Sequence, residues 1–117
     1  MYHPLGRYKN PRISSPFGDR IHPITGNLKF HNGVDFAVPT GTPIFSPARG
    51  KVRDTYFTPR GGNQLLIDHN NGYRTGFAHL DRSNVIGGER VKRGQLIGWT
   101  GETGAVTGPH LHFTVTD

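Results

Sequence analysis

The sequence predicts an all-β domain built mainly from antiparallel sheets. Seventeen glycines and nine prolines among 117 residues favour turns and short strands over long helices. Several short segments alternate apolar and polar residues, as strands with one buried face do. No segment keeps the apolar period of an amphipathic helix over several turns. At this length we expect one domain with a modest core.

Taken in order, the chain begins with a basic segment, residues 1–13, which contains two prolines and no periodicity. We expect an extended arm there, followed by the folded domain at residues 14–117. The first clear strand is residues 30–38, where apolar residues alternate from Val34 until Pro39 ends the run. The turn Asn70-Asn71-Gly72 predicts a hairpin. The two strands of this hairpin are expected at residues 64–69 and 73–79. Further strands are expected at residues 42–45, 50–56 and 96–99. Residues 81–88 can hold one helical turn.

The last expected strand carries two histidines. His110 and His112 are separated by Leu111 and follow a turn at Gly108-Pro109. Because successive side chains of a strand point to opposite faces, both imidazoles should project from one face. Leu111 and Phe113 should then face the core.

A carboxylate and a further histidine occur at similar spacing in the first clear strand. His31 and Asp35 are four residues apart, an even offset that shares a face in an extended segment. The chain has no cysteine, so a transition-metal site must use imidazole and carboxylate, which suits zinc. Adding one histidine of the C-terminal pair gives two imidazoles and a carboxylate.

Each of these signals has a purely structural interpretation. A single His-x-His pair on a polar strand face is more often incidental than metal-binding. His79, taken alone, would more often be a buried and hydrogen-bonded histidine. His3 and His69 are expected to be structural, whereas His22 is less certain because it lies near His31. Serine-nucleophile and phosphate-loop motifs are absent from the sequence.

The formal net charge of +6 allows several kinds of partner. A basic surface suits nucleic acid, anionic lipid or an acidic wall polymer, and it also serves solubility alone. The sequence has no nucleic-acid-binding motif of interleaved basic and aromatic residues, so we expect no nucleic-acid partner. We also expect no membrane span and no signal peptide, because residues 1–13 lack an apolar stretch of about 7–15 residues.

Seven ordered blocks resemble the lysostaphin-like (M23, LytM-type) zinc metallopeptidases, which cleave peptides of bacterial peptidoglycan. They include His31-Asn32-Gly33-Val34-Asp35, Ala78-His79-Leu80 and Thr107-Gly108-Pro109-His110-Leu111-His112-Phe113. The complete set lies at residues 15–26, 31–37, 41–44, 68–75, 78–80, 91–98 and 103–113.

The resemblance implies a barrel-sandwich (duplicated-hybrid-motif) fold with long loops bordering a groove. It implies one zinc per chain, held by His31, Asp35 and His112, with His79 and His110 as the catalytic pair. Which of that pair is the base stays open. The implied activity is hydrolysis of peptide cross-links or stem peptides outside the cytoplasm. From the basic charge we expect additional contacts with anionic wall polymers or lipopolysaccharide, and we expect a monomer. Without a signal peptide, we expect a phage-borne, processed or truncated form.

Three positions depart from the pattern of the family. Phe77 stands where many members have tyrosine, in a role that we expect to be packing. No tyrosine lies between Tyr8 and His31, so we expect His22 or Arg20 to replace an active-site tyrosine. Thr114 stands where many members have glutamate. None of these differences removes a predicted zinc ligand.

Two alternatives compete with an enzyme. One is a non-catalytic wall-binding or hydrolase-activating domain that keeps a structural zinc. The other is a carrier domain of the barrel-sandwich type, because residues 91–98 are similar to a repeat in those folds. Lipoyl and biotinyl carriers need a lysine in a hairpin turn, and the turn Asn70-Asn71-Gly72 has none.

Overall fold

The computed structural model describes residues 2–7, 33–70, 72–106 and 108–116, together with the backbone of residues 12–15. Nine strands and no helix occur in this part of the chain, which confirms the all-β prediction. It contains no helix with the length and hydrophobicity that a membrane crossing requires.

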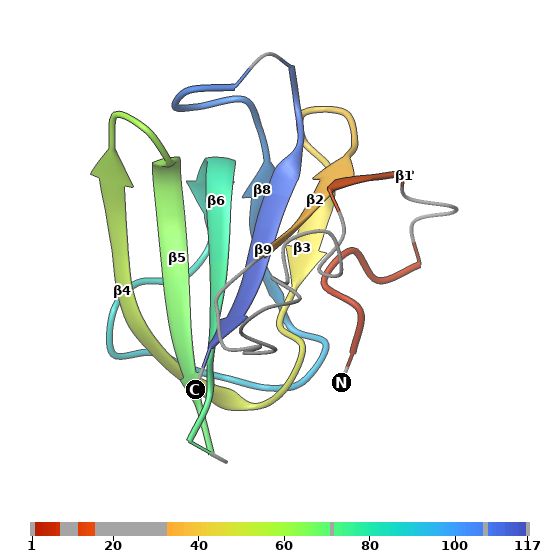
Figure 1. Cartoon of the computed structure of the whole chain (residues 1–117). Coiled ribbons are helices and arrows are strands. Elements are labelled where there is room, and N and C mark those ends of the chain that lie inside the picture. The colour runs from red at the N-terminus through yellow and green to blue at the C-terminus, as the bar shows by residue number, and fades with distance from the viewer. Residues whose placement is uncertain (1, 8–11, 16–32, 71, 107, 117) are drawn as a thin grey trace, which may run out of the picture.

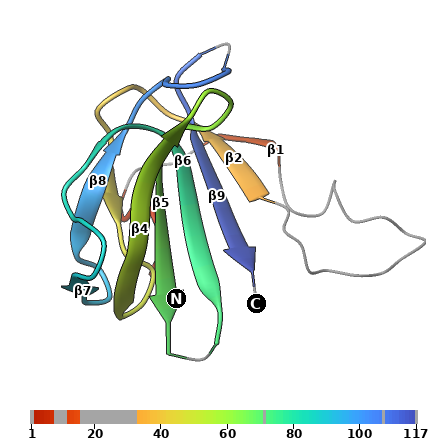
Figure 2. The ribbon, with the colours of Figure 1, turned by 90° about the vertical axis from the view of Figure 1, so that its left-hand side faces the viewer.

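All strand pairs are antiparallel. The main sheet has the order β1-β2-β9-β6-β5-β4-β7, while β8 pairs with β3 and with the end of β6 (Figure 1). Figure 2 shows β7 and β8 on one side of β4, β5, β6 and β9, and β3 pairs with β8, so the strands form two layers that are joined where β7 pairs with β4 and where β8 pairs with β6. The strands are β1 (Arg12–Ser15), β2 (Gly33–Ala37), β3 (Pro43–Phe45), β4 (Gly50–Thr58), β5 (Gly62–His69), β6 (Arg74–Ser83), β7 (Arg90–Val91), β8 (Leu96–Thr100) and β9 (Leu111–Thr116).

The core collects apolar side chains from both layers. On β9, Leu111 and Phe113 are buried, as their alternation with the two histidines predicts. The ring of Phe113 lies 5.4 Å from that of Phe77 on β6, which confirms a packing role for Phe77. The other buried apolar residues of the strands are Val34, Phe36, Ile44, Val52, Ala78, Leu65, Ile67, Leu80, Val91 and Ile97.

Two local predictions were wrong. Residues 81–88 contain no helical turn, because β6 continues to Ser83 and its last residues pair with β8. Residues 1–13 are not simply an extended arm: residues 4–7 form a turn, and Leu5 is buried in the core. Backbone hydrogen bonds join Tyr2 to Pro47 and Phe45 to Pro4. The start of the peptidase domain at residue 14 stays a prediction, and β1 spans that position.

Two loops meet closely beside the first residue of β5. The amide N–H of Ala105 donates to the carbonyl of Arg60, at 3.0 Å. Gly104 has a φ of 85°, and a Cβ there would lie 2.4 Å from the backbone nitrogen of Gly62. A side chain at position 104 would therefore push the two loops apart.

Gly104→Ala should destabilise the fold more than Gly88→Ala. Both glycines have a left-handed φ, which costs an alanine about 1–2 kcal/mol. A Cβ at position 88 meets nothing within 4 Å, whereas one at position 104 meets backbone and should add about 1–3 kcal/mol. Urea unfolding of the two variants would measure the difference. Equal stabilities would show that the close approach of the loops contributes nothing.

Candidate active site

One row of residues crosses three adjacent strands at the centre of the candidate site. Asp35 on β2 lies opposite His112 on β9, and His112 lies opposite Ala78 on β6. The Nδ1 atom of His112 is 2.5 Å from Oδ1 of Asp35. Two strands that are distant in sequence thus bring an imidazole and a carboxylate together. The sequence predicted Asp35 on the first of these strands and His112 on the second.

Gly33 leaves room for this imidazole. A Cβ at position 33 would lie 2.4 Å from Cε1 and 2.7 Å from Nε2 of His112. Real Cβ atoms do not approach other atoms so closely, so any other residue at position 33 would displace the ring. The glycine inside the His-x-x-x-Asp motif therefore has a steric role.

The donors on these strands fit the predicted zinc in chemistry. Carboxylate oxygen and imidazole nitrogen are both zinc donors, and Asp35 and His112 provide one of each. Within the described residues, no three His, Cys, Asp or Glu side chains form a complete metal-binding group. The third predicted ligand, His31, lies outside the described residues.

His79 leaves the regular strand geometry. It is the one residue other than glycine with a positive φ, 64°, among those described. Its amide N–H donates to the carbonyl of Gly61, and the pairing of β6 shifts register nearby. Neighbouring residues of a regular strand face opposite sides, yet His79 and Ala78 line the same pocket. The left-handed backbone turns the His79 imidazole to the site.

Thr103 holds the His79 ring in one orientation. Nδ1 of His79 lies 2.9 Å from the Thr103 carbonyl, which can only accept, so Nδ1 carries the hydrogen. The Thr103 hydroxyl donates to the carbonyl of Leu80 and accepts the amide N–H of Asn63. The neutral His79 ring therefore has Nε2 as its acceptor atom.

Partial burial favours the neutral form of His79. Desolvation is the largest cause that lowers the pKa of this imidazole below 6.5, and positive charge on His110 or His112 would lower it further. The hydrogen bond to Thr103 and the charge of Asp35 oppose the shift without reversing it. At pH 7 the ring is therefore mostly unprotonated and can accept a proton.

His110 lies beside His79. Their ring centroids are 4.8 Å apart, and the His112 centroid is 6.4 Å from that of His79. Nδ1 of His110 is 3.1 Å from the Gly108 carbonyl, so this ring also carries its hydrogen on Nδ1 in the neutral state. A backbone bridge to Gly101 anchors the residue at the start of β9.

These side chains surround one pocket of about 470 Å³. It contains four of the five predicted site residues, and the fifth is His31. The lining residues are Asp35, Thr58, Arg60, Gly61, Gln64, Ala78, His79, Ala105, His110 and His112.

Sequence reasoning missed three polar residues of this pocket: Thr58, Arg60 and Gln64. Thr58 is the last residue of β4 and Arg60 lies in the loop between β4 and β5, which gives no periodic signal. Gln64 did carry a signal, since it precedes the buried Leu65 in a strand and must face the other side. Its nearness to the histidines depends on the order of the strands.

His3 and His69, which we expected to be structural, both make hydrogen bonds outside the histidine pocket. Both ring nitrogens of His69 are within hydrogen-bonding distance of partners, the Arg49 carbonyl and the Thr75 hydroxyl. His3 accepts the amide N–H of Leu5 and packs against Phe36. The candidates for replacing a tyrosine, His22 and Arg20, lie outside the described residues.

Thr103→Val should destabilise the protein and free the His79 ring, because it removes the hydroxyl that holds the loop. The loss should be about 1–3 kcal/mol, because the hydroxyl makes two partly buried hydrogen bonds that each contribute about 0.5–1.5 kcal/mol. Thr103→Ser keeps the hydroxyl and is the matched control. Urea unfolding gives the stability, and nitrogen-15 spectra of the histidine ring report the tautomer of His79. If valine and serine behaved alike, the hydroxyl would have no part in holding His79.

Sequence and structure comparisons agree on one family. The profile of Peptidase family M23 matches residues 29–117. Peptidoglycan DD-endopeptidase ShyC of Vibrio cholerae is 48% identical over 103 residues, which are 87% of this chain and 24% of ShyC. DD-carboxypeptidase/endopeptidase Mpg of Neisseria meningitidis is 45% identical over 104 residues, which are 87% of this chain and 24% of Mpg. The chain thus spans about a quarter of the length of these curated relatives.

Solved structures give the same result. The lysostaphin catalytic domain of Staphylococcus simulans superposes with a TM-score of 0.77 at 39% identity, covering 91% of this chain and 80% of that one. A zinc-containing peptidase from Vibrio cholerae superposes with a TM-score of 0.78 at 48% identity, covering 91% of this chain and 33% of that one. With the profile match over most of its length, the chain belongs to peptidase family M23.

Proposed function

We propose that the protein is a zinc-dependent endopeptidase that hydrolyses peptide cross-links or stem peptides of bacterial peptidoglycan. The observation that carries this proposal is the gathering of Asp35, His79, His110 and His112 around one pocket. The relatives named as peptidoglycan endopeptidases support the substrate class. Such a substrate places the reaction outside the cytoplasm, in the wall, the periplasm or the medium.

One zinc ion per chain would be held by His31, Asp35 and His112. Bound there, zinc would supply a Lewis acid and make water acidic enough to lose a proton near neutral pH. Three protein ligands leave a coordination position open, which is typical of catalytic zinc sites.

His79 and His110 would move protons and stabilise developing charge. A neutral imidazole can take a proton from the attacking water and deliver it to the leaving amine. The other imidazole can donate a hydrogen bond from Nε2 to the carbonyl oxygen as negative charge develops, and it does so in its protonated form, because the neutral ring carries its hydrogen on Nδ1. Both rings have a backbone carbonyl at Nδ1, which leaves Nε2 of each for these tasks.

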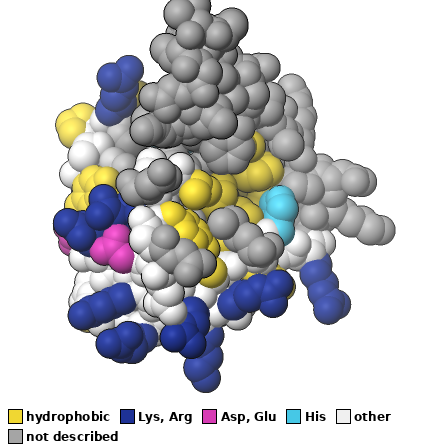
Figure 3. Space-filling view, turned by 60° about the horizontal axis from the view of Figure 1, so that its bottom comes forward, with side chains coloured by type: hydrophobic (Ala, Val, Ile, Leu, Met, Phe, Trp, Pro, Cys, Tyr) yellow, Lys and Arg dark blue, Asp and Glu magenta, His cyan; other side chains and the backbone are white. Residues whose placement is uncertain are grey.

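The basic surface suits additional contacts with anionic wall polymers or lipopolysaccharide. Arg49, Lys51, Arg90 and Lys92 line a hollow where β4 meets β7. Asp68 also borders it but pairs with Arg53 and Arg74, so it does little to neutralise the hollow. Figure 3 shows several Lys and Arg side chains at this end of the molecule, which is the lower end in Figure 1. We propose that the protein acts as a monomer and without nucleic acid.

His110→Ala and His112→Ala should separate catalysis from metal binding. His110→Ala should reduce hydrolysis of purified cell walls by about 10²–10⁴-fold, as loss of a general acid or base does, while one zinc per chain remains. His112→Ala should lose both the zinc and the activity. Metal analysis of both purified variants and a wall-turbidity assay give the two readouts. A His110→Ala enzyme with the wild-type rate would exclude the proposed role.

Chelation should distinguish the enzyme from a non-catalytic domain that has a structural zinc. We expect the wild-type protein to clear a suspension of cell walls, to stop when a chelator is added, and to recover when zinc is restored. A wall-binding or activator domain would bind the walls but release no fragments in any of these states. Mass spectrometry of the released fragments would also identify the bond that is cleaved.

A further inference from the structure

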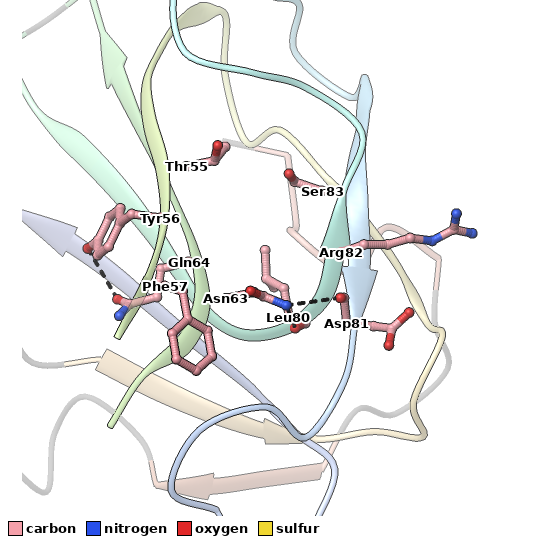
Figure 4. Close-up of a pocket in the computed structure, with 9 residues that line it drawn as sticks. All are labelled: Thr55, Tyr56, Phe57, Asn63, Gln64, Leu80, Asp81, Arg82 and Ser83. Carbon is pink, nitrogen blue, oxygen red and sulfur yellow. Dashed lines mark hydrogen bonds between the residues drawn. The ribbon is translucent and has the colours of Figure 1, made fainter. Parts of the chain in front are cut away.

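A second pocket adjoins the candidate active site. It has a volume of about 430 Å³ and lies between the end of β4, the start of β5 and the end of β6 (Figure 4). Gln64 lines both pockets. The two pockets also contain residues that are adjacent in sequence. Phe57 of the second pocket precedes Thr58 of the first, and Leu80 of the second pocket follows His79 of the first. The lining residues are Thr55, Tyr56, Phe57, Asn63, Gln64, Leu80, Asp81, Arg82 and Ser83.

Gln64 is fixed in place between the two pockets. Its Nε2 donates to the Thr58 hydroxyl at 2.8 Å, and its Oε1 accepts from the Tyr56 hydroxyl at 3.2 Å. Because both the oxygen and the nitrogen of the amide are hydrogen-bonded, the Gln64 side chain is held in one position between the two pockets. A ligand in one pocket can therefore continue into the other past a defined polar group.

Aromatic surface is exposed at this pocket. Phe57 is 62% and Tyr56 36% exposed, and the remaining large exposed hydrophobic residue of the described chain is Ile86, which is not in the pocket lining. Neither aromatic residue belongs to the hydrophobic core cluster. Exposed apolar surface that gathers beside polar groups is typical of a binding site.

The polar groups of the pocket suit a ligand with hydroxyl and amide groups. Thr55 and Ser83 contribute hydroxyls, and Asp81 contributes an exposed carboxylate. Asn63 donates to the carbonyls of Leu80 and Asp81 and so holds the end of β6 against β5.

The positive charge of the pocket is held away from the aromatic rings. The Arg82 guanidinium lies over the Trp99 ring, 4.2 Å from its centroid, and Figure 4 shows it directed away from Tyr56 and Phe57. The surface beside the rings therefore favours an uncharged ligand over an anion. A pyranose ring meets these conditions, because its C–H face can pack on an aromatic ring while its hydroxyls bond at the edges.

We propose that this second pocket binds an N-acetylated sugar of the glycan strand to which the stem peptide is attached. The proposal rests on the proposed function for the identity of the ligand. The glycan would lie against Phe57 while the peptide continues past Gln64 into the histidine pocket. Phe57 would thereby favour substrates that still carry their sugars.

Binding of peptide-free glycan tests the proposal independently of catalysis. Soluble glycan chains, stripped of their peptides, would be titrated into the zinc-loaded protein while backbone amide resonances are recorded. We expect shifts at residues 55–57 and 80–83. Phe57→Ala should weaken binding about tenfold, the effect of losing one aromatic contact. Phe57→Tyr keeps the ring and should bind as the wild type does.

The matched control is Ile86→Ala, which removes an equally exposed apolar side chain outside the pocket and should leave binding unchanged. Absence of binding, or shifts confined to other residues, would overturn the proposal. So would an unchanged affinity in Phe57→Ala. If a sugar-free cross-linked peptide, and not the glycan, shifted residues 55–57 and 80–83, the pocket would be a peptide subsite.

Rates on two substrates then separate this proposal from the proposed function. Phe57→Ala should lower kcat/KM for glycan-bearing walls about tenfold, and leave kcat/KM for a cross-linked peptide without sugars unchanged. An equal loss on both substrates would contradict a glycan subsite. Failure of the wild-type protein to cleave either substrate would instead contradict the proposed function, and the glycan titration would still decide the binding site.

Discussion

The position of β9 between β2 and β6 determines most of the candidate site. Its hydrogen bonds to both neighbours place Asp35, His112 and Ala78 in one row. The same strand buries Leu111 and Phe113, so a slip of one residue would turn the histidines into the core and the apolar residues outward. Packing and chemistry therefore require the same register, and the core stabilises the geometry of the site.

An irregular backbone conformation at His79 completes the candidate site. If β6 were regular, His79 would face away from the pocket that Ala78 lines. Its left-handed φ, unusual for a residue other than glycine, corrects this and is supported by hydrogen bonds to Gly61 and Thr103. Those partners belong to two loops that meet at Gly62 and Gly104, where there is no room for a Cβ. The strain at His79 is thus offset by contacts that lie outside its own strand.

The two pockets share Gln64 in their lining, which matters for the polymeric substrate that we propose. A peptide in peptidoglycan is attached to a glycan, and an enzyme that acts on it can contact both parts. The histidine pocket contains the groups that we propose for proton transfer, while the adjoining pocket offers aromatic and hydroxyl groups. The tightly held Gln64 separates these two chemistries over a short span of β5.

The sequence by itself determined the fold class, most of the strands and four of the residues that meet at the site. Alternating apolar residues identify strands, and the His-x-His spacing implies one shared face, because both follow from the local geometry of an extended chain. The family resemblance separated His110 from His112 in their expected roles. His31, which belongs to the same predicted set, lies outside the described residues, and the assignment of roles stays a prediction.

Other features were decided only by the tertiary structure. The burial of Leu5, the extension of β6 to Ser83 and the short strand β7 all depend on pairing with residues far along the chain. The presence of Arg60 and Gln64 in the histidine pocket, and the second pocket beside Phe57, likewise depend on which strands are neighbours. Local periodicity shows which face a side chain occupies, but it carries no information on what lies across from that face, because that is set by the order and register of the whole sheet.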